Sequence, residues 1–228
     1  MYHKLGPRPR GVRLKGLYVS RSLFERQLSE LHGAGFTTPA HGPPPLCEGN
    51  PGRRIALTFD DGFTNVFQHG LEPLARHGFR AIEFLVADLV GRCNEWEIQE
   101  GETRQPLMEE AQIRDWLAAG HEIGSHTLTH PFLTQVPPAK AREEITASRK
   151  KLEDMFGRPI RHFCYPYGDW DETVRDLVIA AGYETACTTN AGVNAEADSP
   201  FALKRFTARY PSRNLKAIRA RVNAWLKS

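Results

Sequence analysis

Two short stretches of this sequence carry side chains whose types and spacing suit hydrolytic chemistry. The first is Thr58-Phe-Asp-Asp-Gly62, in which two adjacent carboxylates and a glycine end an apolar run. Carboxylates this close repel each other unless a cation or a proton offsets their charge. Taken alone, the stretch fits either a functional site or an ordinary acidic turn with Asp61 and Gly62 at its corner.

The second stretch is Gly124-Ser-His-Thr-Leu-Thr-His-Pro131. Its histidines, His126 and His130, are four residues apart, which places both rings on one face of a helical turn. Pro131 would end that turn at once, so we expect the pair on a short helical loop. Two histidines and one carboxylate leave coordination positions open, as in catalytic metal sites. Together, the two stretches predict a catalytic metal centre.

Alternating strand and helix patterns must position these stretches. Apolar runs typical of buried strands are Met1–Leu5, Ile55–Phe59, Ala81–Val86, Glu122–Ser125, Phe163–Tyr165, Glu184–Thr188 and Ala202–Phe206. After an early helix capped by Ser20, helical patterns cover Asn65–His77, Met108–Ala119, Pro138–Phe156 and Asp171–Ala181. Such alternation predicts an α/β fold, a parallel sheet with helices outside it. In such folds the chemistry gathers at the carboxyl ends of the strands, where both stretches lie.

The bulk composition narrows the class of protein. The chain has 228 residues, 25% of them charged, and a net charge of +3, which gives no argument for nucleic-acid binding. The basic residues after Asp198 fit a solvated helix face, or alternatively a surface for an anionic polymer. We find no signal peptide, no apolar run that could span a bilayer and no paired cysteines, so we expect a cytoplasmic protein. Its oligomeric state is left open.

The sequence resembles a known family in three places. The segments TFDDG (58–62), SHTLTH (125–130) and YPYG (165–168) resemble, in this order, the first three motifs of the polysaccharide deacetylases of carbohydrate esterase family four. The resemblance covers residues 55 to about 190. It implies a distorted (β/α) barrel of about seven parallel strands with outer helices, formed by residues 1–228 as one catalytic domain. The implied activity is removal of N-acetyl groups from a GlcNAc-type glycan or glycoconjugate.

The resemblance also implies roles for individual residues. The first aspartate, Asp60, would be the general base, and one divalent cation would be bound, zinc foremost, with cobalt or nickel as alternatives. The implied metal ligands are Asp61, His126 and His130. Pro166 and Tyr167 would wall the substrate groove, and the Tyr167 backbone N–H would help to stabilise the oxyanion.

Two family elements are missing from their usual places. The family often has an arginine two residues before the proline of its third motif, where this chain has Cys164. We expect Arg205, on the last apolar run, to reach Asp60 instead; the alternative is a structural surface arginine. The usual C-terminal Leu-x-His, which supplies the general acid, is also absent, because no histidine follows His162.

The N-terminus offers a replacement for that acid. Met1-Tyr-His3 opens the chain on an apparent strand, and the segment through Phe36 resembles the circularly permuted branch, the poly-N-acetylglucosamine deacetylases. In that branch an N-terminal histidine is the acid, so we expect His3 in this role, across the groove from Asp60. The alternative for His3 is a frayed terminal residue.

Three functions fit this pattern. The first is the N-deacetylation of a carbohydrate; Trp96, in the polar loop between Gly91 and Pro106, would then stack on a sugar or simply pack the loop. The second keeps the metal site but hydrolyses cyclic amides or ureides. The third is a carbohydrate-binding relic that has lost its chemistry, an alternative that Cys164 keeps open and the intact aspartates and histidines disfavour.

Overall fold

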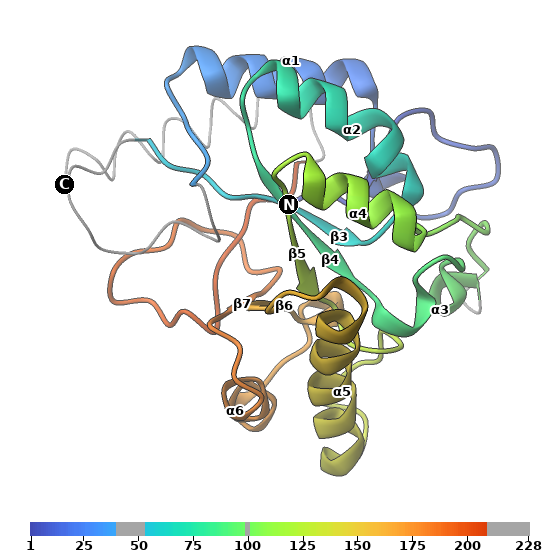
Figure 1. Ribbon diagram of the computed structural model, residues 1–228, viewed down its shortest axis with the longest axis vertical. Coiled ribbons are helices and arrows are strands. Elements are labelled where there is room, and N and C mark those ends of the chain that lie inside the picture. The colour runs from blue at the N-terminus through green and yellow to red at the C-terminus, as the bar shows by residue number, and fades with distance from the viewer. Residues whose placement is uncertain (40–52, 99–100, 209–228) are drawn as a thin grey trace.

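Five parallel strands form the sheet that carries the site. In the computed structural model, which describes residues 1–39, 53–98 and 101–208, their order is β3-β4-β5-β6-β7. Chain order and spatial order therefore agree across this sheet (Figure 1). The strands are β3 Leu57–Asp61, β4 Ala81–Leu85, β5 Glu122–Ser125, β6 His162–Cys164 and β7 Thr185–Cys187. Cys47 and the basic residues from Arg209 onward lie outside the described residues.

The first residues of the chain pair with the free edge of β3. Tyr2 donates its N–H to the Thr58 carbonyl at 2.9 Å and accepts the Asp60 N–H at 3.0 Å, in a parallel bridge. The next two residues form β1 (Lys4–Leu5), which pairs with β2 (Tyr18–Val19). Strand β2 was not predicted, because two residues are too few to display an alternating pattern.

The same N-terminal segment also contacts the other end of the sheet. Leu203 makes a parallel bridge to Cys187 at the edge of β7. Beyond it, the Met1 nitrogen donates to the Phe206 carbonyl at 2.9 Å, and the Ala208 N–H donates to the Met1 carbonyl at 3.0 Å. The sheet therefore closes into a ring. This confirms the distorted barrel, although the predicted strand Ala202–Phe206 is reduced to a single bridge.

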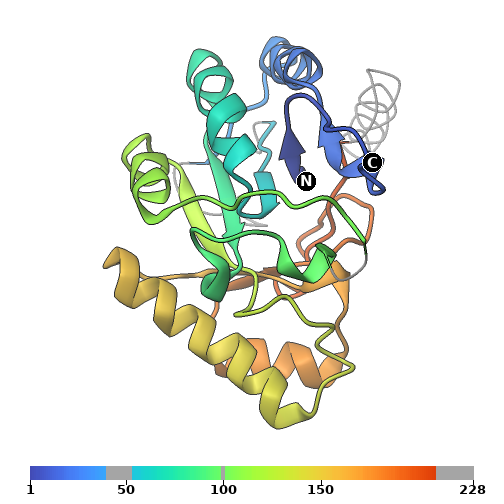
Figure 2. The same ribbon diagram turned by 90° about the vertical axis from the view of Figure 1, so that its right-hand side faces the viewer.

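Helices cover the outside of this ring. Figures 1 and 2 show α1, α2 and α4 along one side of the strands and α5 and α6 along another. The helices are α1 Arg21–Gly33, α2 Thr64–Arg76, α3 Glu95–Ile98, α4 Glu110–Ala118, α5 Pro138–Phe156 and α6 Glu172–Ala180. Single-turn helices cover Lys15–Leu17, Ala87–Leu89 and Pro166–Gly168. No helix in the three described ranges is long and apolar enough to cross a membrane.

Local signals explain where these helices begin and end. The Ser20 side chain accepts the Leu23 N–H and starts α1, and Asp171 does the same for Val174 at the start of α6. Helix α5 ends at Gly157, whose left-handed conformation (φ 65°) costs glycine little. The bounds of α5 are those predicted.

Aromatic packing fixes the helices to the outer face of β3. Phe59 lies edge-on to Phe24 of α1, with ring centroids 5.8 Å apart, and edge-on to Trp116 of α4 at 6.0 Å. Tyr2 stacks on Phe59 at 5.2 Å. Because side chains alternate along a strand, these contacts turn Asp60, the next residue, to the opposite face.

Candidate active site

The carboxyl ends of β3 and β5 bring one aspartate and two histidines together. Asp61 is the last residue of β3, and His126 follows β5 directly. The Asp61 Oδ1 atom lies 3.4 Å from the Nε2 atoms of both His126 and His130. All three side chains are buried, and their ligand atoms lie within 4.8 Å of one another.

The loop that carries the two histidines is not the helical turn we expected. Thr127 and His130 have positive φ angles of 69° and 68°, which interrupt a helix. The loop is instead held by side chains: Thr127 Oγ1 accepts the His130 N–H at 2.9 Å, and Glu144 of α5 accepts the N–H groups of Leu128 and Thr129, each at 2.9 Å. These bonds bring the two imidazoles together without a helix.

The residues present fit a divalent cation. His126 Nδ1 lies 2.7 Å from the Cys164 carbonyl, a contact that fixes the ring with Nε2 toward Asp61. Burial alone would raise the pKa of the Asp61 carboxyl, but interactions with His126 and His130 outweigh it and hold this pKa well below its usual range. The site thus offers one carboxylate and two imidazole nitrogens, a donor set that suits zinc and leaves coordination positions open.

Asp60 points to the inside of the ring and meets Arg205 there. The guanidinium forms two bonds to this carboxylate, Nη1 to Oδ1 at 2.7 Å and Nη2 to Oδ2 at 2.8 Å. Arg205 is itself fixed by Nε donating to the Thr188 carbonyl at 2.9 Å and by Nη1 donating to Thr58 Oγ1 at 3.1 Å. Burial would raise the pKa of Asp60, but Arg205 lowers it below its usual value. The predicted contact between Arg205 and Asp60 is therefore present.

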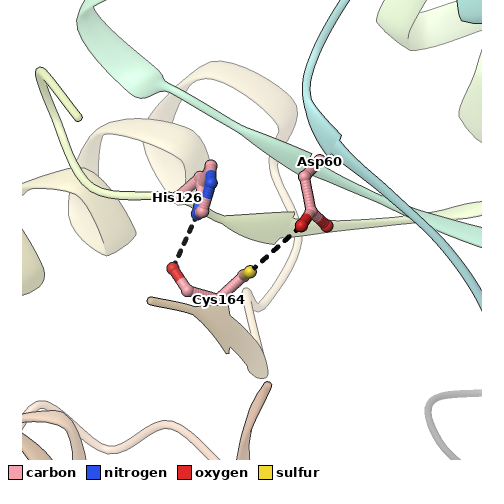
Figure 3. A group of neighbouring side chains, drawn as sticks. All are labelled: Asp60, His126 and Cys164. Atoms are coloured by element: carbon pink, nitrogen blue, oxygen red, sulfur yellow. Dashed lines mark hydrogen bonds between the residues drawn. The ribbon is translucent and has the colours of Figure 1, made fainter. Parts of the chain in front are cut away.

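Asp60, His126 and Cys164 form a second group with ligand-type atoms (Figure 3). The Cys164 Sγ lies 3.6 Å from Asp60 Oδ2, but Arg205 Nη2 lies 3.1 Å from the same sulfur. His126 Nδ1 already contacts the Cys164 carbonyl. The guanidinium thus supplies the positive charge of this group, so its residues fit a cation less well than Asp61, His126 and His130 do.

We expected His3 across the groove from Asp60. In the structure it lies beside Asp60 instead. Its Nε2 is 3.8 Å from Asp60 Oδ2, and its side chain is 16% exposed. The register explains the difference, because the bridge between Tyr2 and Phe59 places the next residues, His3 and Asp60, side by side. Burial lowers the pKa of His3 below its usual value.

Aromatic side chains surround His130. Trp96 stacks on its ring with centroids 4.5 Å apart and planes 24° apart, so this face of the indole contacts a histidine and not solvent. Tyr167, which is 38% exposed, stands edge-on to His130 at 4.5 Å and stacks on Phe132 at 3.8 Å. Pro166 is buried beneath this turn. Tyr167 therefore borders the histidine pair, and the substrate-groove role of Tyr167 and Pro166 stays a prediction.

Sequence reasoning missed two buried charged residues near the site. Glu83 Oε1 accepts the Gly62 N–H at 3.0 Å, directly after Asp61, and burial raises the pKa of Glu83 well above its usual value. Lys4 is fully buried, with Nζ 2.7 Å from Glu97 Oε2 of α3. A signal was available for both, because each is a single charge inside an apolar run.

These features define a class: hydrolases built on a parallel α/β barrel, with a two-histidine, one-carboxylate site at the carboxyl ends of the strands. A family model, polysaccharide deacetylase, matches residues 48–186. The chain belongs to the polysaccharide deacetylase family, and it is therefore a deacetylase of the carbohydrate esterase type.

Individual relatives agree with this placement. YxkH of Bacillus subtilis is 26% identical over 209 residues, which cover 90% of this chain and 68% of YxkH. A chitooligosaccharide deacetylase of a Bradyrhizobium species is 31% identical over 133 residues, or 57% of this chain and 53% of that protein. Among solved structures, IcaB from Ammonifex degensii aligns with a TM-score of 0.82 at 26% identity, over 96% of this chain and 94% of IcaB.

Proposed function

We propose that this protein is a metal-dependent hydrolase that removes N-acetyl groups from GlcNAc-type sugars in a glycan or glycoconjugate. The observation that carries the proposal is the pairing of Asp61 with His126 and His130, next to an Asp60 carboxylate held by Arg205. The name of the Bradyrhizobium relative, a chitooligosaccharide deacetylase, supports an amino-sugar substrate.

The three ligand residues would hold one divalent cation, for which we propose zinc. When bound, such a cation would act as a Lewis acid toward the acetyl carbonyl. The chain's own residues handle the protons. Asp60, kept ionised by Arg205, takes a proton from the attacking water. His3 gives a proton to the departing amine, and the Tyr167 N–H donates to the oxyanion.

The two other functions are weaker on these observations. A carbohydrate-binding relic would have no need to keep a buried carboxylate bonded twice by an arginine. Hydrolysis of a cyclic amide or ureide would use the same ligands, so it differs only in substrate. Both alternatives are outcomes of the experiment below.

The test measures metal content and acetate release on one preparation. We expect acetate to be released from GlcNAc oligomers, the release to stop after thorough chelation, and zinc or cobalt to restore it. Asp61→Ala should lower the rate of acetate release far more than the roughly 10–100-fold that is typical when a residue that only supports a ligand is replaced. Asp88→Ala is the control, because Asp88 is 38% exposed and pairs only with Lys151 in the described contacts.

Each alternative predicts a different result. Full activity after metal removal would contradict metal dependence. Turnover of a cyclic ureide without acetate release would favour the second function. Sugar binding with no hydrolysis of either substrate, in protein that holds the metal, would favour the relic.

A further inference from the structure

The two histidine ligands are supported in different ways. His126 Nδ1 contacts the Cys164 carbonyl at 2.7 Å, the hydrogen bond that usually orients a metal-binding imidazole. His130 Nδ1 is buried and has no hydrogen-bond partner among the described residues. Something other than a hydrogen bond must therefore hold the His130 ring in place.

Two aromatic side chains contact the His130 ring. Trp96 covers one face, stacked at 4.5 Å with an angle of 24° between the planes. Tyr167 meets the ring at 4.5 Å with an angle of 72°. Offset-stacked and edge-on contacts of this kind are the favoured geometries for aromatic pairs. A ring held by both cannot turn about its Cβ–Cγ bond without losing them.

Buried polar groups hold the short helix that carries Trp96. Trp96 lies on α3 next to Glu97, whose Oε2 accepts from Lys4 Nζ and from Asn94 Nδ2, each at 2.7 Å. Lys4 and Asn94 are fully buried. A helix fixed in this way is suited to hold the Trp96 ring against His130.

We propose that Trp96 is a positioning residue that holds His130 in its metal-binding orientation, in place of the missing hydrogen bond. This rests on the proposed metal site. The indole face that lies against His130 is not available to a sugar. This role also links the metal site to the first strand of the chain through Lys4 and Glu97.

The test compares zinc affinity in three purified variants, measured by competition with a chromophoric chelator on metal-free protein. Trp96→Leu removes the stacked ring and should weaken zinc binding by about 10–100-fold, the range found when groups that support a ligand are removed. Trp96→Phe restores a ring and should recover most of the affinity. Trp170→Leu is the matched control: Trp170 stacks on Tyr165 at 5.8 Å and makes no ring contact with His126 or His130 among the described residues, so the zinc affinity of this variant should be unchanged.

A second measurement separates positioning from folding. The visible absorption of the cobalt-loaded protein reports ligand geometry, and it should change in Trp96→Leu and return in Trp96→Phe. In the metal-free proteins, Trp96→Leu and Trp170→Leu should lower the melting temperature by similar amounts. Unchanged zinc affinity and cobalt spectrum in Trp96→Leu would overturn the proposal, and so would an equal loss of affinity in Trp170→Leu. If the wild-type protein bound neither metal tightly, the proposed function itself would fail.

Discussion

Asp60 and Arg205 form the residue pair on which the proposed proton transfer depends. Arg205 favours the charged form of Asp60 and so lowers its pKa, while burial works in the other direction. A base acts only when it is deprotonated. Activity should therefore rise with pH as Asp60 ionises, and the midpoint of that rise should be low in the wild-type protein.

Changing Arg205 should move this midpoint. In Arg205→Ala the burial penalty on Asp60 loses its main opposing interaction, so the acid-side pKa of kcat/KM should rise and turnover at neutral pH should fall. Arg205→Lys keeps the charge but not the two parallel bonds, so its shift should be smaller. Asp60→Asn should retain the metal and lose turnover. A pH profile of Arg205→Ala that overlays the wild-type profile would exclude this role.

The residues of the candidate site were largely visible in the sequence. The two adjacent aspartates and the histidines four apart have spacings that few structural roles require. Lys4 and Glu83 stand out as single charges inside apolar runs, but their partners, Glu97 and the Gly62 N–H, come from other elements, so no local spacing reveals what they bind. The stacking of Trp96 on His130 was hidden for the same reason: it joins α3, which follows β4, to the loop that follows β5, and these segments meet only because the two strands are neighbours in the sheet.

At the scale of elements, α5 determines the shape of the histidine loop. Glu144 is fully buried and accepts three hydrogen bonds from that loop, from the N–H groups of Leu128 and Thr129 at 2.9 Å and from Thr129 Oγ1 at 2.8 Å. Without this carboxylate, two backbone N–H groups of the loop would lose their partner.

Replacing Glu144 should therefore affect both stability and metal binding. We expect Glu144→Ala to lower the free energy of unfolding by about 3 kcal/mol or more, since hydrogen bonds to charged groups contribute roughly 1.5–3 kcal/mol each. Zinc affinity should fall with it. Glu143→Ala is the control, because that neighbouring side chain is 59% exposed and pairs with Lys140. Denaturant unfolding of metal-free protein would measure the difference, and equal stability of the two variants would contradict this role.

The elements themselves were predictable where their patterns are long. Helix α5 has proline in its first turn, glycine just past its last residue and 19 residues of helical pattern, and its predicted bounds hold. The last predicted strand, Ala202–Phe206, has only one bridge in the sheet, at Leu203. The segment is apolar because it is buried against β7. A buried loop and a short strand both have this character, so the sequence does not distinguish them.

At the scale of the whole molecule, the ring is closed by the start of the chain. The N-terminal segment bonds to β3 through Tyr2 on one side and to residues 206 and 208 through Met1 on the other. A strand's position in a barrel depends on its neighbours and not on its place in the sequence. The chain can therefore supply, from its third residue, a histidine beside a base that lies on the next strand of the ring.

This closure makes His3 the candidate for the general acid. Expulsion of an amine from an acetamide requires a proton, and a positioned acid typically contributes about 10²–10⁴-fold. His3→Ala should lose about that factor on a GlcNAc oligomer. The loss should be much smaller on an activated aryl acetate, because a phenolate leaves without protonation. Kinetics on the two substrates, with metal content checked in each preparation, would measure the contrast.

The N-terminal segment that carries His3 provides the control. Tyr2→Phe removes the bond from the Tyr2 hydroxyl to Gln27 Oε1 but keeps the ring that stacks on Phe59 and the backbone pairing with β3. It should leave the ratio of the two activities unchanged, because the imidazole stays beside Asp60. Equal losses of His3→Ala on both substrates would mean that His3 supports the strand and that the proton comes from another group.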